Sequence, residues 1–253
     1  MATSLSDPVA SRATWKAYHT VTRTATYGFL MALPLLALYE VLLLGASPEP
    51  GLQVRVGAEV WMRQWLAMLG VAGRHVLTLV VVLIGIGVYL YERRARIPIR
   101  PRYFGWMLAE SIVYAWGTAI LVSGLVGALL LAAGAESAIA GSGLGTRLAL
   151  SIGAGVHEEL LFRVLLVGGL YAVLRRVLAR RRAAYAVAAV AGALVFSAVH
   201  YIGPLGDVFT LASFTFRFLF GLMLNLLFLW RGFGIAAWTH ALYNVMIVLG
   251  LLG

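Results

Sequence analysis

The chain consists of long apolar stretches separated by short polar connections. Seven of these stretches hold about 18 or more mostly apolar residues each, and a helix of that length at about 1.5 Å per residue crosses a hydrocarbon core of about 30 Å. We therefore predict seven membrane-spanning helices. They lie at about residues 27–44, 71–91, 106–133, 148–174, 183–200, 208–230 and 235–252.

Residues 54–70 show a different pattern, in which apolar and charged side chains alternate. The apolar members are Val56, Val60, Trp61, Trp65, Met68 and Leu69, and the polar ones are Arg55, Glu59, Arg63 and Gln64. This mixture is typical of an amphipathic helix that lies at the membrane surface, and it argues against an eighth span.

The fold class that follows is all-α, a polytopic transmembrane helix bundle of about seven spans plus a possible interfacial amphipathic helix. Residues 1–26 form a polar N-terminal segment without the apolar core and cleavage site of a signal peptide, so the first apolar stretch is expected to be a retained helix. Residues 27–143 hold the N-terminal membrane helices and residues 144–253 the C-terminal ones. Because no linker or internal repeat separates them, we expect a single membrane domain.

Composition supports an integral membrane protein, since 62% of the residues are hydrophobic and only 12% are charged. The absence of cysteine excludes disulfides and thiolate metal sites. The net charge of +10 does not indicate nucleic-acid binding, because the basic residues gather in the segments on one side of the predicted spans. This positive-inside pattern predicts a cytoplasmic N-terminus, an external C-terminus and contact with membrane lipid.

Polar residues inside three of the C-terminal stretches are the candidates for chemistry. Glu158 and Glu159 lie in the middle of one stretch, with Arg163 four residues on, and the later stretches contain His200 and a His240-x-x-x-Asn244 pattern. A carboxylate at the centre of a membrane helix costs about 2.5 to 3.5 kcal/mol on the most lenient scale, so a pair of them indicates a function.

Helical geometry separates the two glutamates. Glu159 and Arg163 are four residues apart and can pair on one face, which removes most of the cost of burying either. Glu158 is rotated by about 100° from Glu159 and shares its face with small residues such as Gly155, so another backbone can approach it. We expect a structural role for Glu159 and Arg163 and a chemical role for Glu158.

Such a set of residues is suited to hydrolysis. A desolvated carboxylate beside a histidine can take a proton from water, and a histidine with an asparagine can donate hydrogen bonds to an oxyanion. Two histidines and a glutamate are equally the ligands of a catalytic zinc site, although the segment after His157 lacks the second histidine of the His-Glu-x-x-His motif. A proton- or metal-coupled transporter could use the same buried groups, but the repeat symmetry or paired broken helices typical of transporters are not found.

The ordered patterns Glu158-Glu159-x-x-x-Arg163, Phe196-x-x-x-His200 and His240-x-x-x-Asn244 resemble the CPBP intramembrane proteases, the family of the CAAX prenyl endopeptidase Rce1 and the bacterial Abi proteins. The resemblance covers about residues 144–253, which would then be the catalytic helices of an intramembrane endopeptidase. It implies that Glu158 and His200 activate water, that His240 and Asn244 hold the oxyanion, and that Glu159 and Arg163 support the site.

The family has been described both as metal-dependent and as metal-free. We favour no metal, because His200 and His240 lie at different depths on the predicted spans, which is awkward for ligating one ion at about 2.0 to 2.1 Å. If a metal such as Zn²⁺ is present, its ligands are expected to be Glu158, His200 and His240.

The predicted orientation places the start of the Glu158 helix and the end of the His200 helix on the external side, whereas a prenylated CAAX protein would arrive from the cytoplasm. We therefore expect a membrane-anchored or exported protein as substrate, and the cytoplasmic (inner) membrane of a bacterium as the location. Arg217 is a candidate partner for a substrate carboxylate, with an ion pair to Asp207 or Glu110 as the alternative.

Overall fold

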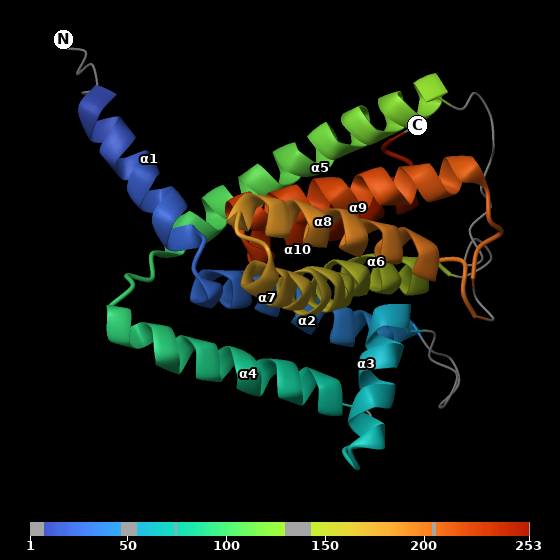
Figure 1. Cartoon of the computed structure of the whole chain (residues 1–253). Helices are drawn as coiled ribbons and strands as arrows, with labels where there is room; N and C mark the ends of the chain where they lie inside the picture. Colours follow the sequence, from blue (N-terminus) through green and yellow to red (C-terminus); the bar gives the residue numbers. More distant parts are fainter. Residues whose placement is uncertain (1–7, 47–54, 74, 130–142, 204–205, 253) are drawn as a thin grey trace, which may run out of the picture.

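The computed structural model describes residues 8–46, 55–73, 75–129, 143–203 and 206–252. Within these ranges every regular element is a helix, so the prediction of an all-α helix bundle is confirmed (Figure 1). The helices are α1 (Pro8–Thr22), α2 (Ala25–Ala46), α3 (Gly57–Met68), α4 (Val76–Glu92), the 3₁₀ turn η1 (Arg93–Ala95), α5 (Pro101–Leu129), α6 (Leu144–Glu158), the π-helix η2 (Glu159–Val167), α7 (Gly168–Val177), α8 (Arg181–Val199), α9 (Leu211–Arg231) and α10 (Phe233–Val248).

Five helices in the described part of the chain are long and apolar enough to cross a membrane, and they identify an integral membrane protein. They cover Ala25–Gly45, Val76–Ala95, Pro101–Val122, Arg181–Val199 and Leu211–Arg231. The remaining two predicted spans are also helical: α6, η2 and α7 follow one another without a break, and α10 is a shorter apolar helix. The prediction of about seven spans is therefore roughly consistent with the structure.

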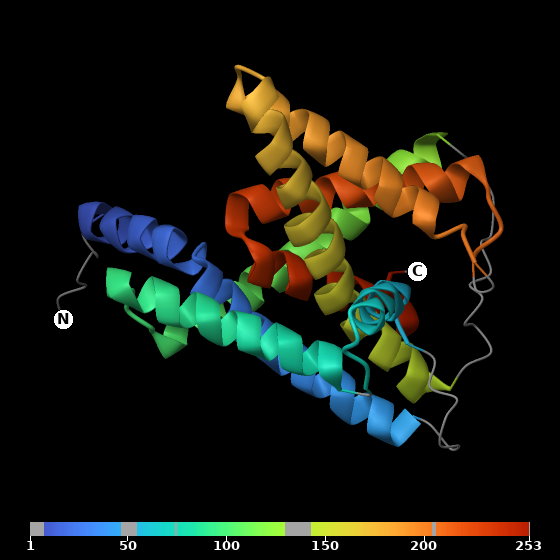
Figure 2. The ribbon, with the colours of Figure 1, turned by 60° about the horizontal axis from the view of Figure 1, so that its bottom comes forward.

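Helix α6 lies at the centre of the bundle, packed against α2 and α10, while α8 pairs with α9 (Figures 1 and 2). Small residues permit the close contact between α6 and α10. A Cβ atom added to Gly155 would lie 2.5 Å from the Ala237 carbonyl oxygen and 2.6 Å from the Ala241 side chain. The expected approach of another backbone beside Glu158 is thus present, and the approaching helix is the one that carries His240.

The sharp connection between α9 and α10 depends on Gly232, whose φ of +84° and ψ of −178° suit only glycine. At its other end, α9 is capped by Thr210, whose hydroxyl accepts a hydrogen bond from the Ser213 amide at 3.1 Å. The turn at Gly232 brings α10 back along the bundle, and the His240 side of α10 faces the helix that carries the glutamates.

The structure adds one helix that the hydrophobic pattern does not predict. Helix α1 lies within the polar segment 1–26 and is joined to the bundle through Tyr18, whose hydroxyl donates to Glu110 at 2.8 Å. Glu110 also accepts from the fully buried Arg231 at 2.6 Å. This buried ion pair connects α1, α5 and α9, and it satisfies most of the charge that would otherwise be stranded in the bundle.

Candidate active site

The helix that carries the two glutamates changes its winding between them. Helix α6 ends at Glu158, and the π-helix η2 begins at Glu159, where an ordinary α-helix is predicted. The apolar pattern does not reveal a π-helix, because the change in hydrogen bonding shifts the register without changing which residues are apolar. π-Helical segments inside α-helices are frequent at functional sites, and this one, nine residues long, places Glu158 and Glu159 at the junction.

Glu159 and Arg163 form the predicted ion pair. Arg163 Nε lies 3.1 Å from Glu159 Oε2, and both residues are fully buried. The Arg163 guanidinium also lies 4.5 Å from the centre of the Phe196 ring. A buried pair of this kind is costly to break, because either partner alone would leave an uncompensated charge.

His240 joins both glutamates through opposite sides of its ring. Its Nδ1 lies 2.7 Å from Glu159 Oε1, and its Nε2 lies 3.8 Å from Glu158 Oε2. Because an ionised carboxylate only accepts hydrogen bonds, Nδ1 is the donor in the contact with Glu159. Glu159 therefore contacts both Arg163 and His240, and its contact with Nδ1 fixes the orientation of the His240 ring.

The Glu158 carboxylate forms fewer close polar contacts than the Glu159 carboxylate. Its side chain is 15% exposed, and the ion-pair contact found for it in the described part of the chain is the 3.8 Å approach to His240. That distance is too long for a direct hydrogen bond. The carboxylate thus keeps its capacity to accept a proton or bind water.

His200 lies directly after α8, next to this group. Its Nδ1 donates to the Phe196 carbonyl oxygen at 2.6 Å, which leaves Nε2 of the neutral ring as an acceptor. The Phe196 ring lies 4.9 Å from the His200 ring and 6.3 Å from the His240 ring, so it stands against both histidines. His200 is also within electrostatic range of Glu158 and His240.

Asn244 lies one helical turn beyond His240 on α10 and is half-buried. No hydrogen bond of its side chain is found within the described ranges. The structure thus brings Glu158, Glu159, Arg163 and His240 into one contact group, with His200 adjacent and Asn244 on the same helix as His240.

Arg217 adopts the alternative predicted for it. It forms an ion pair with Asp207 and a hydrogen bond to the Tyr201 hydroxyl at 2.8 Å. The Asp207 amide in turn donates to the His200 carbonyl oxygen at 2.9 Å. Arg217 therefore helps to fix the segment that follows His200.

One buried polar residue near the site was not singled out from the sequence. Asn225 on α9 donates to the Ala189 carbonyl oxygen at 2.8 Å, and its own carbonyl oxygen accepts from the Tyr185 hydroxyl at 2.6 Å. The sequence does indicate a buried polar contact here, since Asn225 lies within the apolar stretch 208–230. Its contacts connect α8 and α9.

The suitability of these residues for a metal can be judged from their positions. In the described ranges, no group of three His, Asp or Glu side chains converges as a metal site would require. Glu158 approaches Nε2 of His240 at 3.8 Å, and the Nδ1 atoms of both histidines are engaged, so Nε2 is the nitrogen of each ring that remains for a metal. As they stand, Glu158, His200 and His240 do not form a ligand set.

Comparison with known proteins gives one positive result. Residues 140–246 match the family model described as Type II CAAX prenyl endopeptidase Rce1-like. No curated protein and no solved structure matches the chain. All six candidate site residues lie inside the matched region, which confirms the resemblance seen in the motifs. Residues 140–246 of this membrane protein are thus similar to the Rce1-like type II CAAX prenyl endopeptidases, a family of proteases.

Proposed function

We propose that the protein is an intramembrane endopeptidase that hydrolyses a peptide bond of a membrane-associated protein with a water molecule activated by Glu158 and His200. The observation that carries this proposal is the position of His240 between the two glutamates, 3.8 Å from Glu158 and 2.7 Å from Glu159. It brings two of the three motifs, from helices about 80 residues apart in the chain, into one buried group.

Water activation is assigned to the residues whose acceptor atoms are open. The Glu158 carboxylate has no hydrogen bond within the described residues, and the Nε2 atom of His200 is an acceptor because Nδ1 donates to Phe196. Glu158 takes a proton as the water oxygen attacks the carbonyl carbon, with His200 orienting the water. The proton then passes to the leaving amine as the C–N bond breaks, which yields a carboxylic acid and an amine.

Oxyanion stabilisation is assigned to His240 and Asn244. With Nδ1 held by Glu159, His240 donates from Nε2 only when its ring is protonated on both nitrogens. The Glu159 carboxylate compensates the resulting positive charge, and Arg163 pairs with the second oxygen of Glu159. The Asn244 amide supplies a second donor from one turn further along α10.

The substrate is proposed to be a membrane-anchored or exported protein, cleaved in the bacterial cytoplasmic membrane by a chain whose N-terminus is cytoplasmic. Residues 144–253 are the proposed catalytic helices. The basic residues between the spans support this orientation. We propose no resident metal; a zinc-dependent alternative requires Glu158, His200 and His240 to converge from their present positions.

The proposal is tested by incubating purified wild-type protein and Glu158→Gln with membranes of a strain that lacks the gene, and by identifying new protein N-termini by mass spectrometry. Wild type should produce specific new N-termini and Glu158→Gln none. Glu92→Gln is the matched control, because Glu92 caps the start of α2 through the Thr26 amide at 2.7 Å and is expected to leave cleavage unchanged. A farnesylated CAAX peptide in a parallel sample tests the cytoplasmic substrate, and identical N-termini from wild type and Glu158→Gln would reject the proposal.

A further inference from the structure

Helix α6 is held on two nearly opposite faces just before it ends at Glu158. Gly153 and Gly155 lie two residues apart, so their faces are about 200° apart on an α-helix. Gly155 packs against α10, the helix that carries His240. Gly153 packs against α2, since a Cβ atom added to it would lie 2.5 Å from the Tyr39 ring. The position of Glu158 relative to His240 therefore depends on both contacts.

The Tyr39 side chain fills the space beside Gly153 and also contacts His157, the residue directly before Glu158. Tyr39 is fully buried, and its ring lies edge-on to the His157 ring, with 5.0 Å between the ring centres. His157 is 1% exposed, and its Nδ1 donates to the Gly153 carbonyl oxygen at 3.0 Å. Because Gly153 and His157 are four residues apart, they share one face of α6. Tyr39 thus supports the end of α6 from the side away from α10.

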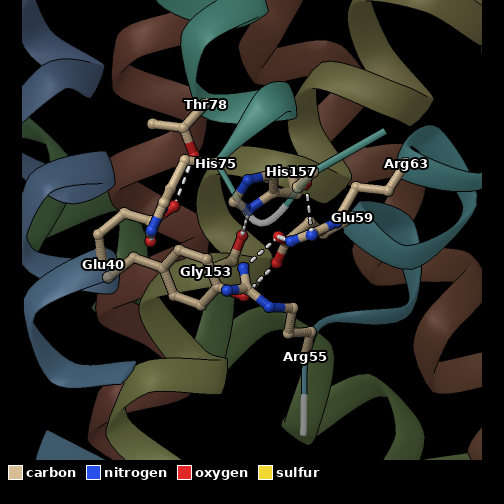
Figure 3. A network of polar contacts seen from close by, with 10 residues as sticks. Glu40, Arg55, Glu59, Arg63, His75, Thr78, Gly153 and His157 are labelled. Atoms are coloured by element: carbon tan, nitrogen blue, oxygen red, sulfur yellow. Dashed lines mark hydrogen bonds and ion pairs between the residues drawn. The ribbon is translucent and has the colours of Figure 1, made fainter. Parts of the chain in front are cut away.

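The Tyr39 hydroxyl is fixed by a carboxylate of helix α3. It donates a hydrogen bond to Glu59, which is 1% exposed and also forms ion pairs with Arg55 and Arg63 (Figure 3). Arg63 is held in turn by the Gly73 carbonyl oxygen at 2.8 Å. A buried carboxylate with several charge-assisted contacts keeps one position, so the hydroxyl that donates to it is fixed as well. Helix α3 thereby sets the position of Tyr39 against α6.

The Glu158 carboxylate depends on this support because its own contacts do not hold it. Its approach to His240 is 3.8 Å, and no hydrogen bond of the carboxylate is found within the described residues. The backbone of α6 therefore determines where the carboxylate lies. A misplacement of a reacting group by about 1 Å can cost about 100-fold in rate.

We propose that Tyr39 is a positioning residue, which holds the end of α6 so that Glu158 keeps its approach to His240 and to the attacking water. This inference rests on the proposed function, because it concerns the same Glu158. Tyr39 is fully buried on the side of α6 away from His240, so it does not contact the substrate. Removal of its hydroxyl should accordingly lower kcat and leave KM nearly unchanged.

The test compares kcat and KM of wild type, Tyr39→Phe and Thr78→Val, per mole of folded full-length protein, on one substrate identified from its new N-terminus. Each variant loses one hydroxyl that donates to a carboxylate and keeps the shape of the side chain. Thr78→Val is the matched control, because the Thr78 hydroxyl donates to Glu40 at 2.5 Å and connects α2 with α4 instead of α6. Tyr39→Phe should lower kcat by about tenfold or more. Thr78→Val should behave as wild type does.

A second readout does not depend on cleavage. Amide hydrogen–deuterium exchange in residues 152–167 should be faster in Tyr39→Phe than in wild type and unchanged in Thr78→Val, because only the first variant loosens α6. Folding of each variant is checked by thermal unfolding in detergent. If Tyr39→Phe does not fold, Glu59→Asp replaces it, since the shorter side chain draws the carboxylate away from the Tyr39 hydroxyl and keeps the charge.

The outcomes separate this inference from the proposed function. Unchanged kcat or unchanged exchange in Tyr39→Phe would overturn the positioning role, as would equal losses of kcat in Tyr39→Phe and Thr78→Val. A higher KM with unchanged kcat would also overturn it, because it would indicate a role in substrate binding. In these cases the dependence of cleavage on Glu158 still stands. Cleavage by Glu158→Gln at the wild-type rate would instead reject the proposed function and this inference together.

Discussion

Nδ1 of His240 lies 2.7 Å from Oε1 of Glu159, and this contact ties the last helix of the chain to the π-helix that follows Glu158. Glu159 thereby has two partners, since its second oxygen lies 3.1 Å from Arg163. A carboxylate shared between an arginine and a histidine holds both in place, and it determines which nitrogen of the histidine carries a proton.

Glu159→Gln should therefore impair activity by a different route from Glu158→Gln. The amide oxygen can still accept from His240 Nδ1, but the negative charge that stabilises a protonated ring is lost. We expect roughly 10²-fold slower cleavage, the order seen when one oxyanion donor is lost. Cleavage rates of folded wild type and Glu159→Gln check this, and a Glu159→Gln rate within a few-fold of wild type would show that Glu159 does not act through His240.

Arg163→Ala should reduce the amount of folded protein. It leaves Glu159 with its charge buried and only His240 to compensate it, at a cost of about 3 to 5 kcal/mol. The expected readouts are a lower yield from membranes and a lower unfolding temperature in detergent, while Glu158→Gln keeps both. Equal losses of folded protein in the two variants would indicate that the whole group is structural.

Phe196→Leu tests the ring that lies against both histidines. Leucine preserves an apolar side chain but removes the aromatic contacts to His200, His240 and the Arg163 guanidinium. We expect a fall in kcat with KM nearly unchanged, because the histidines lose their positioning while substrate contacts stay. Phe196→Tyr, which keeps the ring, should recover most of the rate, and failure of this recovery together with normal folding would contradict the positioning role.

Glu59→Gln should destabilise the protein in a pH-dependent manner. The pKa of Glu59 is lowered from its ordinary value of 4.5, so the folded state binds its proton less readily than the unfolded state does. The stabilisation is fully present above about pH 4.5 and is lost as the pH falls through the lowered pKa. Unfolding temperatures of wild type and Glu59→Gln should differ at pH 7 and converge in acid; a constant difference across this range would disprove the linkage.

Membrane orientation can be measured by cysteine labelling, because the native chain has no cysteine. Gln64→Cys, at an exposed position on the polar face of α3, should react with an impermeant thiol reagent in intact cells. Ala179→Cys, between α7 and α8, should react only after permeabilisation, because basic segments resist translocation. The opposite result would reverse the topology and favour a cytoplasmic CAAX substrate.

The helices of the bundle follow directly from the apolar stretches, because the length and composition of a membrane span are local properties. The Glu159–Arg163 pair is equally local, four residues apart on one helix. The contact between His240 and Glu159 is not a local property, because it depends on how α10 packs onto α6 through Gly155 and Ala241. The spacing of residues along the chain carries no information about this packing.

The π-helix η2 and the burial of Glu59 could not be predicted from the order of apolar and polar residues, for two different reasons. The π-helix changes backbone hydrogen bonds without altering the order of apolar residues. Glu59 was predicted on the polar face of an amphipathic helix, but Tyr39, Arg55 and Arg63 surround it, so that the structure buries a residue whose local pattern indicates exposure.

The central claim, that Glu158 is the base that activates water, is tested most directly by single-turnover cleavage in H₂¹⁸O with one substrate identified from its new N-terminus. Wild type should place one ¹⁸O in the new carboxylate at a measurable rate. Glu158→Gln, folded as shown by its unfolding temperature, should be slower by about 10² to 10⁴-fold, the contribution of a general base. A Glu158→Gln rate within a few-fold of wild type would contradict the account.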